Sequence, residues 1–379
     1  MKKIILLFII VFTSCKKTTN NSLHQIKSNS IIEKKDNSLK LNKVVITGTT
    51  DDKTAFEYLN IMNRTYLFAR THLDVTKEII SDSLHMVLNS IDKPLFSEIV
   101  TGGDKAFYRG FIFLIPGDTI SVKIKDGKMI FFGKNAIENN YYSEMDRQTP
   151  EYQKNPYLGN LNIYKESIKS IYNKRIDFLN QYVKSNNIQS KLFINTIKTN
   201  LKHEYLFSLI NPVNVKSRIE GHYYNEFDGL MPIIQKETTK NSELIFDLYD
   251  YFGEIPIEEF KDVIALNNSS YFKDNINQYI RYYFLGSKHL AYSKEKFLAE
   301  KKFIQKNFIG ETENYAIARM IRDYHLKGFG NSLSTIELLK NSIDEYEDKF
   351  AKPSYIDFMK GIKEDLESYD FELRESALN

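Results

Sequence analysis

The sequence predicts an α+β protein in which an N-terminal antiparallel β-sandwich is followed by an all-helical domain. Between residues 41 and 135, short apolar runs are separated by turns that contain glycine and proline, which is typical of an all-β domain. Between residues 138 and 370, apolar residues recur every three or four positions, which is typical of amphipathic helices. The first 15 residues have the pattern of an export signal and are not expected to belong to the fold.

Length and composition allow two or three domains and argue against a dedicated nucleic-acid-binding protein. The chain has 379 residues and a formal charge of +3, and loss of its first 14 residues would remove Lys2 and Lys3 and leave a charge of +1. A nucleic-acid-binding domain typically carries a strong excess of Lys and Arg on one face. The chain has 25 Tyr and 26 Phe but no Trp, so we expect cores that are rich in aromatic rings.

Residues 1–15 predict a lipoprotein signal peptide with a lipobox. Met1-Lys2-Lys3 forms a positive start, and a nine-residue apolar run from Ile4 to Phe12 follows it. Nine residues span only about 14 Å as a helix, which is too short to cross a bilayer. Small residues then precede Cys15, the single cysteine of the chain, in a pattern that resembles a lipobox. By that resemblance Cys15 becomes the lipidated N-terminus; the alternative is an ordinary signal peptide with a cysteine there by chance.

Residues 16–40 are polar with little periodicity, and they predict a flexible tether. Acyl chains on Cys15 would hold the protein on a membrane surface, because each buried CH₂ contributes about 0.8 kcal/mol. The tether lacks the acidic stretch that marks surface export in some bacterial lipoproteins. We therefore expect a lipid-anchored protein of the cell envelope that faces the periplasm, with the membrane as its first partner.

Residues 41–137 predict the β-sandwich, built from about eight short strands. The run from Leu84 to Ile91 alternates at the two-residue period of a half-buried strand, with His85 on the solvent side. Pro116-Gly117-Asp118 separates two strands, where proline presets φ and glycine accepts a positive φ. Asp118 is therefore interpreted as a turn residue that caps its own backbone, and His85 as a strand residue rather than a metal ligand.

The order of these segments resembles the N-terminal β-sandwich of TlpA-like thiol–disulfide oxidoreductase lipoproteins. The resemblance rests on Lys93-Pro94, the turn from Pro116 to Ile120, Phe131-Phe132-Gly133 and the segment from Ala136 to Tyr141. In that family a lipobox, this sandwich, a helical middle region and a C-terminal thioredoxin-fold domain follow one another. The resemblance thus implies a sandwich and a helical region here, and a thioredoxin-fold domain that is missing.

Residues 138–370 predict a domain of helices joined mostly by short loops. A capping box from Ser334 to Glu337 is expected to start one of them. The clearest apolar stripe steps by three and four residues through Ile336, Leu339, Ile343, Tyr346 and Phe350. Such stripes are interpreted as core faces of packed helices and not as the walls of a cofactor site.

The sequence displays no pattern for catalysis, for a metal or for a cofactor. None of the seven histidines has a second histidine at the three- or four-residue spacing of a helical metal site. Lys202-His203-Glu204 places neighbours on different helix faces and so forms no dyad, and Glu258-Glu259 is interpreted as an acidic first turn of a helix. The chain has no P-loop, dinucleotide fingerprint or nucleophile elbow. A thioredoxin-type enzyme needs two thiols, and this chain has one cysteine.

Two functions follow from these observations. The first is a membrane-anchored cell-envelope lipoprotein with a non-catalytic accessory or binding role, for which a protein partner in the envelope is a further expectation. The second is a truncated TlpA-like thiol–disulfide oxidoreductase that lacks its catalytic Cys-x-x-Cys domain. Residues 371–379 bear on this choice, because Phe371-Glu372-Leu373 resembles the opening strand of a thioredoxin module, whereas a polar tail is the alternative.

Overall fold

The computed structural model describes residues 43–52, 54–63, 71–72, 75–80, 82–89, 91–103, 106–212, 230, 233–234, 247–286, 289–350 and 353–376. Cys15 and the predicted tether lie outside these ranges. The strands are β1 (Val44–Thr50), β2 (Tyr58–Asn63), β3 (Thr71–His72), β4 (Val75–Ile80), β5 (Ser83–Leu88), β6 (Leu95–Gly102), β7 (Phe107–Leu114), β8 (Thr119–Lys125) and β9 (Lys128–Gly133).

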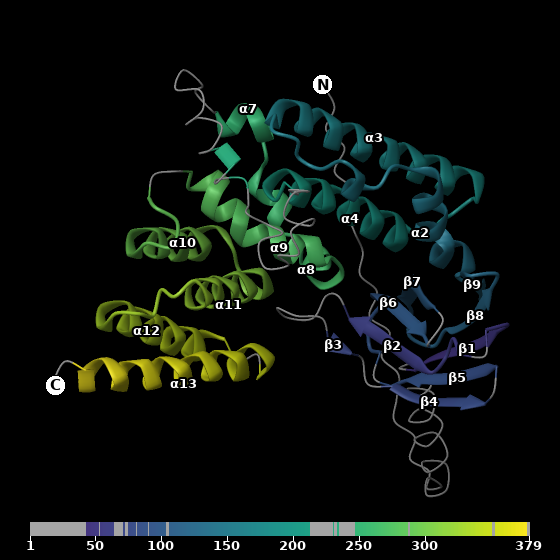
Figure 1. Cartoon of the computed structure of the whole chain (residues 1–379), viewed down its shortest axis with the longest axis horizontal. Helices are drawn as coiled ribbons and strands as arrows, with labels where there is room; N and C mark the ends of the chain where they lie inside the picture. The colour runs from purple at the N-terminus through teal and green to yellow at the C-terminus, as the bar shows by residue number, and fades with distance from the viewer. Residues whose placement is uncertain are drawn as a thin grey trace, which may run out of the picture.

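The helices follow the last strand. They are α2 (Ala136–Gln148), α3 (Leu161–Ser185), α4 (Lys191–Ile210), α7 (Leu248–Phe252), α8 (Val263–Asn268), α9 (Ser270–Tyr279), α10 (Lys294–Asn307), α11 (Gly310–Leu326), α12 (Leu333–Lys349) and α13 (Pro353–Ser376). Two short 3₁₀ turns, η1 (Tyr152–Lys154) and η3 (Ile257–Phe260), and a π-helical turn, η4 (Ile280–Phe284), lie between them. The predicted α+β class, with strands first and helices second, is confirmed. Figure 1 shows the helices stacked from α3 at the top to α13 at the lower left, with the strands at the lower right.

The strands form two sheets, one in the order β4-β5-β1-β8-β9 and one in the order β3-β2-β6-β7. Neighbouring strands are antiparallel except β1 and β8, which run parallel. The prediction of purely antiparallel pairing is therefore wrong for the five-stranded sheet, which is mixed. The physical reason is that β1 and β8 are far apart in the sequence, so no tight turn sets their relative direction.

Both sheets contribute side chains to one buried cluster, which includes Ile46 from β1 and Ile112 from β7. The two sheets come close where β7 passes β9. A Cβ atom added at Gly110 would lie 2.7 Å from both Met129 Sδ and the ring of Phe131. Glycine at this position therefore allows an approach that any larger residue would prevent.

Helix α2 lies against the edge strands β7 and β9, each the last strand of its sheet. Asn139 Oδ1 accepts a hydrogen bond from the backbone N–H of Phe113 in β7 at 2.8 Å. Asn140 does the same for β9, since its Oδ1 accepts from Phe131 N–H at 3.0 Å and its Nδ2 donates to Phe131 C=O at 2.9 Å. Two consecutive asparagines thus satisfy backbone groups that an edge strand would otherwise leave open.

The strands and helices meet in a separate hydrophobic cluster, here called the junction core. It consists of Phe96, Phe113, Tyr141, Met145, Leu179, Ile188, Phe193, Ile197 and Leu201, which come from β6, β7, α2, α3, α4 and the α3–α4 loop. Among the described residues the first helix begins at Ala136, two residues before the predicted boundary at 138. A larger cluster fills the rest of the helical part and contains the predicted stripe residues Ile336, Leu339, Ile343 and Tyr346.

Three local predictions need correction. The capping box of α12 pairs Ser332 with Thr335 instead of Ser334 with Glu337, because the Thr335 hydroxyl reaches the Ser332 N–H at 3.3 Å. Residues 371–376 continue α13 and do not form a strand, with Arg374 Nε bonded to Asp370 one turn earlier at 2.7 Å. Strand β4 was not predicted, because its side chains are almost all exposed and show no alternating burial.

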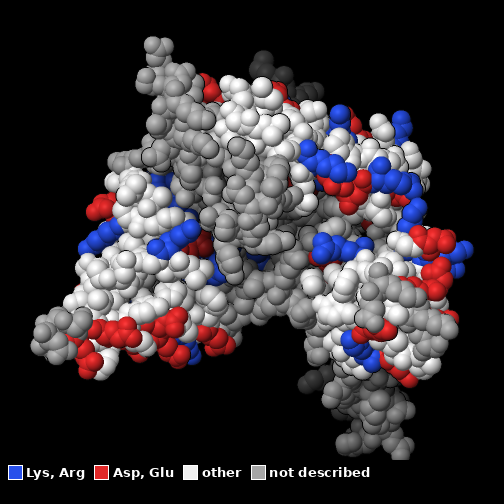
Figure 2. All heavy atoms as spheres, in the orientation of Figure 1, with Lys and Arg blue, Asp and Glu red and all other residues white. Residues whose placement is uncertain are grey.

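The face drawn in Figure 2 carries both signs of charge. Lys and Arg are interspersed with Asp and Glu over most of it, and acidic side chains gather at the lower left, along α13. That helix exposes Asp357, Glu364, Asp365, Glu367, Glu372 and Glu375. No single sign dominates this face as a whole.

Candidate functional site

The residues weighed for chemistry in the β-domain belong to the scaffold. His85 is exposed on β5, as predicted. Asp118 sits in a turn closed by its own N–H and the Ile115 carbonyl at 3.0 Å, which confirms its turn role. Its carboxylate, however, bonds Asn135 and lies 3.6 Å from Lys134 Nζ, so it holds the start of α2 rather than capping its own backbone.

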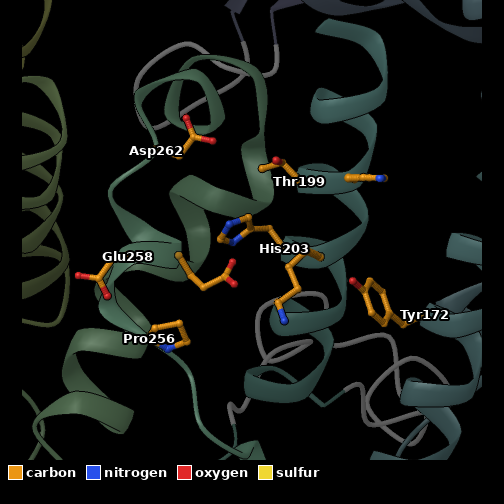
Figure 3. Close-up of a pocket in the computed structure, with 9 residues that line it drawn as sticks. Tyr172, Thr199, His203, Pro256, Glu258 and Asp262 are labelled. Atoms are coloured by element: carbon orange, nitrogen blue, oxygen red, sulfur yellow. The ribbon is translucent and has the colours of Figure 1, made fainter. Parts of the chain in front are cut away.

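A pocket of about 480 Å³ opens between α3, α4 and the segment that runs through η3 to the start of α8. We call it the α4 pocket. It is lined by Tyr172, Lys198, Thr199, Lys202, His203, Pro256, Glu258, Glu259 and Asp262. Figure 3 shows His203 reaching from α4 toward the segment that carries Pro256 and Glu258, with Tyr172 on the α3 side. Its volume lies within the range of small-ligand sites in proteins.

His203 forms the floor of the pocket and is 1% exposed. Its Nδ1 faces the Nδ2 donor of Asn275 at 3.4 Å, so this nitrogen is an acceptor. The ring also forms a hydrogen bond with the backbone of Glu259. The rings of Phe260 and Phe272 pack edge-on against it, with centroids 5.6 and 4.8 Å away. The imidazole is therefore enclosed by aromatic rings and bonded to its surroundings, and it connects η3 to α4.

Two acidic residues of the pocket already have partners. Glu258 pairs with Lys261 at 3.3 Å. Asp262 is the N-cap of α8 and accepts from the N–H groups of Ile264 at 2.8 Å and Ala265 at 3.2 Å. Both carboxylates therefore already have partners within the protein. The interpretation of Glu258-Glu259 as an acidic first turn is confirmed, because both residues lie in the first turn of η3.

Three charged groups of the pocket remain uncommitted. Within the described ranges, no ion pair or hydrogen bond engages the side chains of Lys198, Lys202 or Glu259. Lys202 and Glu259 are half-buried, and Lys198 is exposed. Burial raises the pKa of Tyr172, and the negative charge of Glu259 raises it further. Tyr172 and Glu259 therefore lie close enough across the pocket to interact electrostatically.

No family model, curated protein or solved structure matches this chain. The α4 pocket is therefore interpreted from its chemistry alone. Among the residues that the structure describes, no group of three His, Cys, Asp or Glu side chains could hold a metal ion. The same part of the chain contains no helix that is both long and apolar enough to span a membrane.

A second group of charged residues lies inside the helical part and lines no part of the α4 pocket. Arg281 on η4 forms a two-pronged ion pair with Glu300 on α10, with Nε–Oε1 at 2.7 Å and Nη2–Oε2 at 3.0 Å. Tyr324 donates to the same Oε1 at 2.8 Å, and Tyr292 accepts from Arg281 Nη1 at 3.1 Å. The exposed fractions of Arg281 and Glu300 are 1% and 0%. With their polar atoms bonded to each other, these residues are part of the core and form no ligand site.

Sequence reasoning examined His203 and Glu258-Glu259 but did not bring them together. Tyr172 and Lys198 were not singled out for chemistry, and Lys202 was weighed only as a neighbour of His203, since a lysine on an amphipathic helix has no distinguishing signal of its own. One weak signal was available. Lys198 and Lys202 are four residues apart and therefore share a helix face.

We predict that His203 makes the stability of the protein fall in mild acid. Burial lowers the pKa of His203 from 6.5 to about 3, and the charge of Lys202 adds to this effect. Between these values the unfolded chain binds a proton that the folded chain rejects, so stability is lost as pH falls through this window. From pH 7 to pH 5 the loss should be about 2 kcal/mol, measured by chemical denaturation at each pH.

The variant His203→Gln should lose this part of the pH dependence. Between pH 7 and pH 5 its free energy of unfolding should fall by about 2 kcal/mol less than that of the wild type. The matched control is His85→Gln, which removes an exposed histidine from β5. That variant should follow the wild-type pH profile. Equal profiles for the wild type and His203→Gln would contradict a neutral, buried imidazole.

Proposed function

We propose that this chain is a membrane-anchored lipoprotein of the cell envelope with a binding role and no catalytic role of its own. The observation that carries the proposal is the content of the α4 pocket: three charged side chains without a partner in the described part of the chain, beside a buried histidine that bonds Asn275 and the backbone of Glu259. The His203 imidazole is buried and already bonded, so it is not open to a substrate as a general base. The two lysines and Glu259 are charged groups that can hold a ligand of complementary charge.

The anchor in this proposal is Cys15. Its support is the order of a positive start, a nine-residue apolar run and small residues before the single cysteine. A tether of about 25 polar residues would then separate the membrane from the folded part. The proposed location is the periplasmic side of the envelope, where the pocket would meet small molecules or the exposed ends of a protein partner.

We further propose that the two sheets pack face to face as a β-sandwich of the TlpA-like lipoprotein type. The single buried cluster shared by both sheets supports this arrangement. The alternative reading as a truncated oxidoreductase has lost one of its supports, because residues 371–376 are helical and not the opening strand of a thioredoxin module. The single cysteine also offers no dithiol for disulfide exchange.

The anchor is tested by replacing Cys15 in full-length protein made in bacterial cells fed with labelled palmitate. The wild type should carry the label, and Cys15→Ser should carry none, since the hydroxyl cannot form the thioether of a lipoprotein anchor. The control Thr13→Ser keeps a small residue ahead of the cysteine and should retain the label. Label on Cys15→Ser, or its absence from the wild type, would rule out this anchor.

The non-catalytic role fails if the purified wild type accelerates insulin disulfide reduction.

A further inference from the structure

Two lysines present a pair of positive charges on one wall of the α4 pocket. Lys198 and Lys202 are one helical turn apart on α4, so their Cβ atoms lie about 5–6 Å from each other. Ammonium groups at this spacing on flexible stems can each hold a separate carboxylate, or can share one. Because neither has a partner within the described residues, a ligand would not have to displace an existing ion pair.

Glu259 supplies a negative charge from the opposite wall, and its backbone is held in two ways. It forms a hydrogen bond with the ring of His203 on α4. The chain leading to it is fixed by Tyr283, whose hydroxyl accepts from Ile255 N–H and donates to Gly253 C=O, both at 3.0 Å. The relative position of the acidic and basic walls is therefore set before any ligand binds, which lowers the entropic cost of binding.

We propose that the α4 pocket binds an amino acid or short peptide that carries one ammonium group and two carboxylates. This inference rests on the binding role proposed above and names the ligand class of that site. The three uncommitted side chains sum to one net positive charge, which a ligand with one net negative charge neutralises. The ligand's carboxylates lie against Lys198 and Lys202, and its ammonium group lies against Glu259.

Ligands of simpler charge fit less well. A phosphate ester would satisfy the two lysines but would place its charge beside Glu259, where like charges repel. A metal cation or a polyamine would be repelled in the same way by the two lysines. Tyr172 on the α3 side and Pro256 on the η3 side (Figure 3) offer apolar surface for the backbone and side-chain carbons of a peptide.

The test is calorimetric titration of the full-length protein in detergent, at low salt and pH 7, with L-glutamate and with the tripeptide Ala-Ala-Glu. Binding of either probe supports the proposed ligand class. The probe that binds more tightly shows whether the ligand is a free amino acid or a peptide. N-acetyl-Ala-Ala-Glu lacks the ammonium group and should bind about threefold to tenfold more weakly, as expected for half-exposed charge-assisted hydrogen bonds. No binding of either probe up to about 10 mM would overturn the proposal.

Substitutions then test which side chains of the pocket bind each charge of the ligand. Glu259→Gln should weaken binding of Ala-Ala-Glu and remove its advantage over the N-acetylated form. The double change Lys198→Gln and Lys202→Gln should weaken both forms. The matched controls Lys191→Gln, on the same helix but outside the pocket, and Glu254→Gln should bind as the wild type does. Equal effects of pocket and control variants would overturn the proposal.

The proposed ligand class and the proposed membrane anchor can each fail without the other. If neither probe binds while Cys15 still carries palmitate, the ligand class is wrong and the anchored lipoprotein stands. If the probes bind with the expected pattern while palmitate is absent, the α4 pocket is a binding site and the membrane anchor is wrong. The palmitate experiment and the titration use independent readouts, so neither result depends on the other.

Discussion

Replacing Arg281 by methionine is expected to lower the free energy of unfolding by about 3–5 kcal/mol, the usual cost of leaving one member of a buried ion pair alone. Methionine fills much of the volume but leaves Glu300 without its two-pronged partner in a core where that carboxylate has no exposed surface. Denaturant unfolding followed by circular dichroism measures the loss. The effect should be one of the largest that a single substitution in this chain can produce.

A triple variant separates the cost of an unpaired charge from the cost of altered packing. Arg281→Met, Glu300→Leu and Tyr324→Phe together remove the ion pair and the hydroxyl that donates to it. Because well-packed apolar residues can replace a buried ion pair at little cost, the triple variant should recover most of the lost stability. A triple variant as unstable as Arg281→Met alone would mean that shape, and not charge pairing, explains the loss.

Replacing Phe193 by alanine is expected to cost about 3–5 kcal/mol, the range for removing a buried phenylalanine ring. Phe193 is 1% exposed in the junction core, and its ring packs against Phe113 of β7 and Tyr141 of α2 with centroids 5.5 and 5.6 Å away. The cavity would open between the sheets and the helices. Unfolding should therefore be followed by near-ultraviolet tyrosine signals as well as by helical circular dichroism, and both midpoints should fall.

The matched control is Phe132→Ala in β9, where the ring is exposed. A substitution at such a position usually changes stability by less than about 0.5 kcal/mol. Similar losses for Phe193→Ala and Phe132→Ala would show that the junction core contributes little to the stability of the whole protein. A fall in only one of the two midpoints for Phe193→Ala would show that the sheets and the helices unfold independently.

The parts of the fold that sequence predicted best are those where burial repeats with a clear period. The alternation from Leu84 to Leu88 matches β5, and the stripe from Ile336 to Tyr346 matches the buried face of α12. Strand β4 was not predicted because an edge strand with both faces near solvent has no alternation of apolar and polar residues. The parallel pairing of β1 and β8 could not be predicted either, because strand direction across a long connection leaves no local signal.

At the C-terminal end, a short pattern left two interpretations open, a strand or a polar tail, and the structure shows a helix. Phe371-Glu372-Leu373 has the alternation of a strand, but three residues cannot distinguish a strand from one turn of a helix. In the structure Leu373 packs against the helical core and Arg374 reaches Asp370, so tertiary contact and a helical ion pair determine the outcome. The family resemblance had favoured the strand before any packing was known.

The α4 pocket was beyond the reach of sequence reasoning for a different reason. Its acidic wall follows Pro256 and its basic wall lies on α4, more than 50 residues earlier, and no spacing rule connects the two. His203 attracted interest as a chemical group, yet its role is to join these walls through the Glu259 backbone. A buried histidine of this kind acts through position, and only coordinates reveal its partners.

The amide pair Asn139 and Asn140 has a consequence for how molecules of this protein meet one another. An uncovered strand edge can recruit a strand from a neighbouring molecule and so begin aggregation. Here two adjacent amides on one turn of α2 accept hydrogen bonds from the backbone of Phe113 in one sheet and of Phe131 in the other, which obstructs strand addition at both edges. Molecules that share a crowded compartment can then collide along this side without exchanging strands at these two edges.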